Sequence, residues 1–431
     1  MHARCGVLGR PDTSRIGIPC VLASHAPIPS RRRSSFRFGL QAAEIRILFS
    51  CTAAEGHFRP LVPLARAFVD DGHEVAFATS RSAADRIATA GFQLLPAGID
   101  EAELHARHAP ARKRLQTLPP NERRPFAFSS RFAAIEAPGK IAELRAVAAE
   151  WQPDLIVHES ADLAAPIVAA VLGVPSVHHG WGRLVPRACF ERAAAETESL
   201  WRDQGLDPEP LCGAFRGRYV DICPPSLQPE PAPDGVPVVQ LRPAEPAGVT
   251  NAPAPWGAHL PECPTVYLTL GTVFNDLSTF RLLLDALADL DCSVIATIGR
   301  GNDPASLAPL PENAIVERYI PQAQVLPHVT LVVSHGGSGS MLAALAHGLP
   351  QLLLPQGADQ FENANACRAA SAARMLMPTE LSVDAVRAEL IILLDELSYG
   401  ERAREIASEI AAMPSAADVA SQLTSAPNAG S

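Results

Sequence analysis

A short apolar segment that runs into glycines and serines constrains this chain more than any other stretch. Residues 332–340 read Val-Val-Ser-His-Gly-Gly-Ser-Gly-Ser, and an Ala-rich helix is expected over residues 341–347. Glycine lets the backbone approach an anion, and the N–H groups at a helix start point toward it. The segment predicts a strand-to-helix turn of an α/β protein that holds a diphosphate. Such turns also use glycine for purely steric reasons, so the surrounding residues must decide.

Size and charge limit the classes of protein that fit. With 431 residues, 47% of them hydrophobic, the chain can build two cores. The net charge of -10 argues against a nucleic-acid partner or an anionic membrane surface. The nine cysteines are scattered without a CxxC pair, and no apolar run is long enough to span a bilayer. We expect a cytoplasmic protein without stable membrane insertion.

The chain divides into segments of different composition. Residues 1–43 are rich in Arg, Ser and Pro and poor in acid, which predicts a disordered or processed extension. Residues 44–223 begin with a βαβ pattern: a strand at 45–51, a loop at 52–59, a helix that Gly72 ends, and a strand at 74–79. This pattern predicts a parallel sheet whose ligand crevice lies beyond the carboxyl ends of the strands, where His57 falls.

A second alternating unit follows a Pro-rich stretch. Residues 224–264 are expected to be a linker, residues 265–415 a second Rossmann-like domain, and residues 416–431 a flexible tail. The second unit starts with a strand at 266–270 and a Gly271-Thr272 turn. The predicted fold class is therefore α/β, with two Rossmann-like doubly wound domains that face a cleft.

Four motifs in order resemble a known signature. They are Tyr319-Ile320-Pro321-Gln322, Leu326-Pro327-His328, Val333-Ser334-His335-Gly336-Gly337 and Pro355-Gln356-Gly357-Ala358-Asp359-Gln360. With Gly56-His57-Phe58-Arg59-Pro60 in the first half, they are similar to the UDP-glycosyltransferase-like superfamily, above all to its bacterial branch that decorates macrolides, enediynes and related aglycones. The resemblance covers residues 45 to about 415. It implies the GT-B fold and an inverting, metal-independent hexosyltransferase.

The resemblance also implies catalytic roles. His57 would be the general base that takes a proton from an acceptor hydroxyl, and Glu159 would orient its ring, although the family more often has Asp there. Asp162 is the alternative for this orienting acid. A His57 that only hydrogen-bonds its loop, and a Glu159 that is a solvated acid at a strand end, are the structural alternatives.

On the donor side the resemblance assigns three groups of residues. Tyr319 and the backbone of Ile320 would contact the nucleobase, although Tyr319 could instead be a core tyrosine. Asp359 and Gln360 would hold the sugar hydroxyls, with a helix N-cap as the alternative for the pair. The diphosphate would be bound by Thr272, His335, Gly337, Ser338, Gly339 and Ser340.

The remaining expectations concern the substrates and a metal, and one departure from the family pattern bears on the donor. UDP-sugar enzymes commonly carry a Glu eight residues after the signature His, where this chain has Ala343, so we expect a dTDP-linked, deoxygenated hexose as co-substrate. No separate cofactor is expected. No metal is expected either, because the one DxD sequence of the chain, Asp289-Leu290-Asp291, ends a predicted helix and is interpreted as part of its solvated face. The natural-product acceptor would lie near the aromatic side chains of Phe126, Phe128 and Trp181, which could equally be core residues.

Two other functions share these features. A sugar-nucleotide epimerase has the same architecture, and a catalytically silent homologue would bind nucleotide or assist a partner enzyme. The Gly56-His57 motif and the Asp359-Gln360 pair favour glycosyl transfer. The oligomeric state is left open, with a homodimer as one option.

Overall fold

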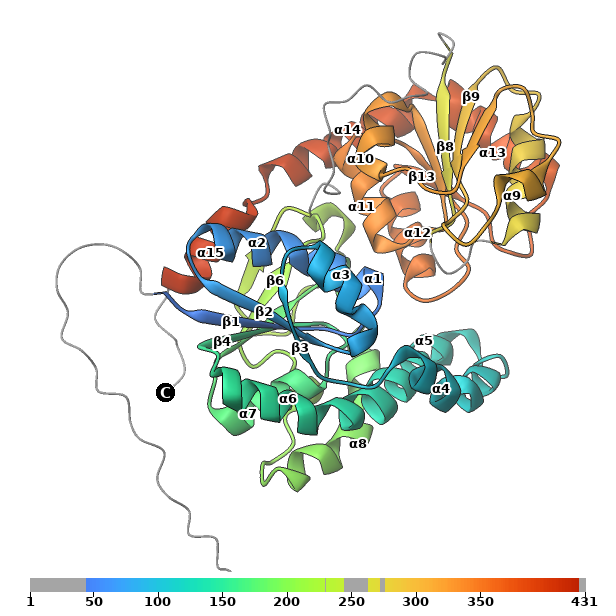
Figure 1. Ribbon diagram of the computed structural model, residues 1–431. Coiled ribbons are helices and arrows are strands. Elements are labelled where there is room, and N and C mark those ends of the chain that lie inside the picture. Colours follow the sequence, from blue (N-terminus) through green and yellow to red (C-terminus); the bar gives the residue numbers. More distant parts are fainter. Residues whose placement is uncertain (1–43, 229, 244–262, 272–275, 426–431) are drawn as a thin grey trace, which may run out of the picture. The chain divides into compact units, whose positions relative to one another are not determined.

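The computed structural model describes residues 44–228, 230–243, 263–271 and 276–425, which contain two parallel sheets (Figure 1). The predicted extension 1–43, Thr272 and much of the predicted linker lie outside the described residues. The first sheet has the order β3-β2-β1-β4-β5-β6-β7, and all its pairs are parallel. Its strands are β1 (Arg46–Ser50), β2 (Glu74–Thr79), β3 (Gln93–Pro96), β4 (Leu155–Glu159), β5 (Ser176–His179), β6 (Arg218–Asp221) and β7 (Val238–Gln240).

Helices cover both faces of this sheet because successive strand residues point to opposite faces. Ile47 and Phe49 pack into a core with α2, whereas Leu48 packs into a separate core with α6, α7 and α8. The helices of this half are α1 (Glu55–Phe58), α2 (Val62–Asp70), α3 (Ala84–Thr89), α4 (Glu101–Leu115), α5 (Pro120–Phe128), the π-helix η3 (Ser129–Glu136), α6 (Ala137–Trp151), α7 (Ala164–Leu172) and α8 (Arg187–Asp203).

The second sheet has the order β10-β9-β8-β11-β12-β13 and is also parallel. Its strands are β8 (Thr265–Thr269), β9 (Ser293–Thr297), β10 (Ala314–Glu317), β11 (Leu331–Ser334), β12 (Gln351–Leu353) and β13 (Ala373–Met375). The helices are α9 (Leu277–Leu287), α10 (Gln322–Val325), α11 (Ser338–Ala346), α12 (Gln360–Ala369), α13 (Val383–Asp395), α14 (Leu397–Ala412) and α15 (Ala416–Ser425).

Both sheets reverse their strand order at one point, and such a switch point is where doubly wound sheets bind ligands. In the first sheet it lies between β1 and β4, and in the second between β8 and β11. His57 follows β1 and Glu159 ends β4, while His335 follows β11. The topology therefore positions the predicted residues at the two crevices.

The structure corrects three predicted boundaries. The expected loop at 52–59 contains helix α1 and the start of the 3-10 helix η1 (Arg59–Leu61). The expected linker begins too early, because β7 still pairs with β6 in the first sheet. The expected tail from residue 416 is not flexible up to residue 425, because Val419, Ala420 and Leu423 of α15 are buried in the same core as α2.

Candidate functional site

His57 and Glu159 lie side by side at the first switch point. His57 Nδ1 is 3.2 Å from Glu159 Oε2, although the N–H direction lies off the line of a good hydrogen bond. The Glu159 side chain is 1% exposed, so it is not the solvated strand-end acid considered above. Its carboxylate also accepts bonds from the Thr52 N–H at 3.2 Å and the Ala161 N–H at 2.6 Å. These bonds hold the carboxylate in place beside the imidazole ring.

Asp162, the other acid considered for this role, has different partners. Lys140 Nζ and Ser50 Oγ each lie 2.6 Å from Asp162 Oδ2, and the Lys140 side chain is 7% exposed. Burial by itself would raise the pKa of Asp162, but the Lys140 ammonium and the Ser50 hydroxyl outweigh it and lower that pKa. The same ammonium donates to the carbonyls of Cys51 and Ala78, at the ends of β1 and β2. Asp162 therefore belongs to a buried network that joins Lys140 to Ser50 and to the backbone near the ends of β1 and β2.

Aromatic rings surround the His57 imidazole. The Trp181 ring meets it edge-on with centroids 4.5 Å apart, and the Phe132 ring lies 5.5 Å away. Phe128 lies one ring further back, 5.2 Å from Phe132, and is buried. Phe126 is not beside the others: the guanidinium groups of Arg114 and Arg192 each lie 5.2 Å from its ring. The structure thus brings Trp181 and Phe132 to His57, but it gives Phe126 other neighbours.

A charged pair accompanies Phe132 on the π-helix η3. Arg131 Nε donates to Glu136 Oε1 at 2.7 Å, and the Arg131 guanidinium lies 4.8 Å from the Phe132 ring centre. Burial raises the pKa of the Glu136 carboxyl, and Arg131 opposes this rise. π-Helices are rare and often occur at functional sites. Sequence patterns did not single out this pair, because a π-helix has no distinctive hydrophobic period.

At the second switch point the start of α11 is open to an anion. Its cap residue is Gly337, and no side chain caps its first turn. The N–H groups of Ser338, Gly339 and Ser340 therefore keep the unpaired character of a helix start. Gly339 is exposed, and a Cβ there would meet nothing within 4 Å. This geometry fits the diphosphate site that the sequence predicts, although the helix begins three residues earlier than expected.

His335 lies between two glycines at the same place. A Cβ on Gly271 would lie 2.6 Å from His335 Cε1, and a Cβ on Gly337 would lie 2.5 Å from His335 Nε2. Both positions must therefore lack a side chain for the imidazole to fit. Burial lowers the pKa of His335 to about 4, so the ring is neutral at neutral pH. A neutral ring carries one N–H that can donate to a phosphate oxygen.

The Asp359 side chain lies against the start of α11. Ser338 Oγ donates to Asp359 Oδ2 at 2.7 Å, and Asn363 Nδ2 lies 3.1 Å from the same oxygen. Asp359 occupies the N-cap position of α12, but its side chain makes no capping hydrogen bond. Gln360 is buried, and its Oε1 accepts from the N–H of Gly357 at 3.1 Å and from that of Gln356 at 2.8 Å. Asn363 was missed, although it lies one helical turn after Asp359.

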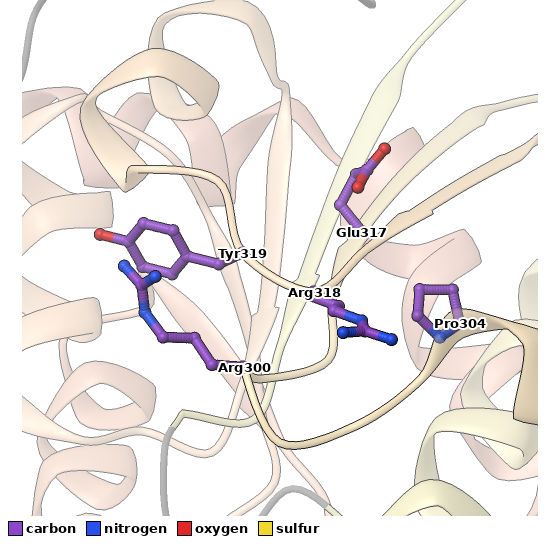
Figure 2. A pocket seen from close by; sticks show the side chains of 5 residues that line it. All are labelled: Arg300, Pro304, Glu317, Arg318 and Tyr319. Carbon is purple, nitrogen blue, oxygen red and sulfur yellow. The ribbon is translucent and has the colours of Figure 1, made fainter.

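Tyr319 lines an open cavity of about 360 Å³ with Arg300, Pro304, Glu317 and Arg318 (Figure 2). The Tyr319 side chain is 42% exposed, so it is not a core tyrosine, whereas Ile320 beside it is buried. Arg300 was not among the predicted site residues. The signal in the sequence was its place shortly after the apolar run at residues 294–298, at the edge of the sheet where ligands bind.

The loop that carries Trp181 contacts both the residues around His57 and the residues around the start of α11. Gly182, the next residue, is buried against the start of α11, and a Cβ there would clash with Ser338 Oγ. The same loop is held by Arg183, whose Nη1 donates to the carbonyl of Glu362 on α12 at 2.9 Å. The loop that packs on His57 is thus also in contact with the predicted diphosphate site.

Neither a metal-binding cluster nor a membrane-spanning helix is seen among the described residues. No group of three or more His, Cys, Asp or Glu side chains is placed to hold a metal ion in this part of the chain. Within the same residues, no helix is both long enough and apolar enough to cross a membrane.

Comparisons with known proteins agree with this architecture. Residues 66–271 match the "Erythromycin biosynthesis protein CIII-like, N-terminal domain", and residues 281–426 match the corresponding C-terminal domain. The L-demethylnoviosyl transferase of Streptomyces niveus is 32% identical over 88% of this chain and 97% of its own length. The 3-alpha-mycarosylerythronolide B desosaminyl transferase of Saccharopolyspora erythraea is 28% identical over 87% and 96%.

Solved structures show the same fold. The glycosyltransferase SsfS6 of Streptomyces sp. SF2575, in complex with thymidine diphosphate, has a TM-score of 0.71 and 26% identity over 89% of this chain and 100% of its own. VinC in complex with dTDP has a TM-score of 0.73 and 25% identity over 88% and 98%. The predicted GT-B fold is confirmed, and the chain belongs to the EryCIII-like family of bacterial natural-product glycosyltransferases.

Proposed function

We propose that this enzyme transfers a deoxyhexose from a dTDP-sugar to a hydroxyl group of a natural-product aglycone, with inversion at the anomeric carbon. The observation that carries the proposal is the pair formed by His57 and the buried Glu159 at the first switch point. Glu159 faces Nδ1, which leaves Nε2 as the nitrogen for the acceptor proton. The apolar rings of Trp181 and Phe132 beside it suit an aromatic or macrocyclic acceptor.

The proposed reaction is one displacement. His57 Nε2 takes the proton of the acceptor hydroxyl while its oxygen forms the new bond to the anomeric carbon. The bond from that carbon to the diphosphate oxygen breaks on the opposite face, which inverts the centre. Negative charge then grows on the leaving diphosphate, where the first turn of α11 and the neutral His335 can donate hydrogen bonds. Asp359, beside Ser338, would hold the sugar hydroxyls.

Ala343 supports dTDP as the nucleotide. It is 4% exposed within α11 and packs in a core cluster, so it offers no acceptor to a ribose 2'-hydroxyl. A deoxyribose has no such hydroxyl to satisfy. The names of the relatives, among them desosaminyl and daunosamine transferases, support a deoxygenated sugar, and two structural neighbours hold thymidine diphosphate.

Two measurements test the proposal. Turnover of dTDP- and UDP-linked forms of one deoxyhexose should favour the dTDP form, and a preference for UDP would refute the nucleotide assignment. The variant H57A should lose transfer while it still binds thymidine diphosphate. Unchanged transfer by H57A would refute the role of His57 as general base. If the wild-type protein binds nucleotide but transfers no sugar, it is a catalytically silent homologue.

A further inference from the structure

The cavity beside Tyr319 holds an arginine that the proposed reaction has not yet used. The Arg300 guanidinium lies only 3.8 Å from the centre of the exposed Tyr319 ring, and both side chains line the 360 Å³ cavity (Figure 2). We propose that Arg300 forms the second wall of the nucleobase site, so that the base stacks between the guanidinium group and the Tyr319 ring. This inference rests on the proposed function, because it assumes that the cavity receives a pyrimidine nucleotide.

The present distance shows what must move. A stacked base needs ~3.5 Å of separation from each neighbouring plane. Arg300 at 3.8 Å from the Tyr319 ring therefore occupies the place where a base would stack. The guanidinium must shift outward by about one such spacing, and it can then cover the opposite face of the base. Both of its planar faces suit stacking, which a lysine ammonium cannot imitate.

The backbone around Arg300 permits this shift. Arg300 lies between Gly299, whose φ is +92°, and Gly301, where a Cβ would meet nothing within 4 Å. The ends of the turn are held together by Asn302, whose Nδ2 donates to the carbonyl of Ile298 at 2.8 Å. Arg300 itself is exposed. The turn is thus anchored at its base by Asn302, while Arg300 at its tip is exposed.

Arg318 provides a matched control in the same cavity. It has the same charge, but its Nη2 lies 3.2 Å from Asp303 Oδ1, and no contact with the Tyr319 ring is seen for it among the described residues. A loss of binding caused only by charge should appear equally in R300A and R318A. A loss caused by stacking should appear in R300A, and also in R300K, which keeps the charge.

Calorimetric titration of the full-length enzyme with thymidine diphosphate and uridine diphosphate tests the inference. We expect R300A to weaken thymidine diphosphate binding about tenfold, R300K nearly as much, and R318A less than ~threefold. Unchanged or tighter binding by R300A would overturn the inference. Arg300 would then cover the Tyr319 ring in the free enzyme without contributing to nucleotide binding. An equal loss in R318A would overturn it as well.

The same titration separates this inference from the proposed function. If the wild type binds uridine diphosphate better, the dTDP assignment fails, and Arg300 is judged on uridine diphosphate with the same variants. If the wild type binds neither nucleotide, both proposals fail. If the wild type binds thymidine diphosphate and the Arg300 variants bind it equally well, this inference fails and the proposed function stands.

Discussion

Replacing Glu159 by glutamine keeps the size of the side chain and removes the charge that faces His57. Oε2 of Glu159 accepts from the Ala161 N–H at 2.6 Å and lies 3.2 Å from His57, whereas Oε1 accepts from the Thr52 N–H at 3.2 Å. Glutamine has one acceptor oxygen, so its NH2 group must face one of these donors. The shorter bond decides that the oxygen stays at Ala161 and the NH2 group turns toward Thr52. The variant E159Q can thus still orient the imidazole.

The lost charge sets the magnitude of the effect. Two unit charges 3.2 Å apart attract by ~5 kcal/mol at an effective dielectric constant of ~20. Only part of this acts in the transition state, because proton transfer to His57 is incomplete there and the two backbone N–H groups already stabilise the carboxylate. About half, ~3 kcal/mol, corresponds to a ~10²-fold lower kcat for E159Q. The variant E159A also loses the orientation of the ring, so its kcat should fall ~10³-fold.

The assay is the initial rate of glycoside formation at saturating donor and acceptor, followed by chromatography. The KM for the donor should not change, because Glu159 lies on the first sheet and the proposed donor residues lie on the second. Glu143 is a matched control, since its carboxylate also accepts a backbone N–H, that of Gly98 at 2.9 Å, without touching His57. A wild-type kcat for E159Q, or an equal loss for E143Q, would refute the reasoning.

Two further predictions concern stability. The variant K140M leaves the Asp162 carboxylate buried without its ammonium partner, so urea unfolding at pH 7 should show that the free energy of unfolding falls by ~3–5 kcal/mol. The double variant K140M/D162N should recover part of this loss. An unchanged urea midpoint for K140M would contradict the prediction. Burial lowers the pKa of His179 from 6.5 to about 4. As pH falls from 6.5 toward 4, the His179 imidazole is protonated in the unfolded chain but not in the folded protein, so the free energy of unfolding falls over this range. That loss should reach ~3 kcal/mol, and thermal unfolding of H179N should show a smaller dependence on pH in this range.

The alternation of strands and helices was predictable because buried parallel strands are short apolar runs. The strand at 74–79 has the predicted ends. The boundaries that differ have causes that lie elsewhere in the chain. Residues 238–240 lie in a Pro-rich stretch but pair with β6, and residues 416–425 carry apolar residues at helical spacing that pack in the same core as α2. Pairing and burial of this kind depend on distant residues.

The sequence alone determined the fold class, because periodicity and the positions of glycine and proline are local properties of the chain. It also pointed to His57 and to the start of α11, since both lie in the segment between an apolar strand and the helix that follows it. The choice between Glu159 and Asp162 needed the tertiary structure, because it depends on Lys140, which lies on helix α6 and pairs with Asp162. Arg300 likewise became visible only when the turn after β9 brought its guanidinium onto the Tyr319 ring. Which charges meet is decided by packing between segments far apart in the chain, and no local pattern encodes it.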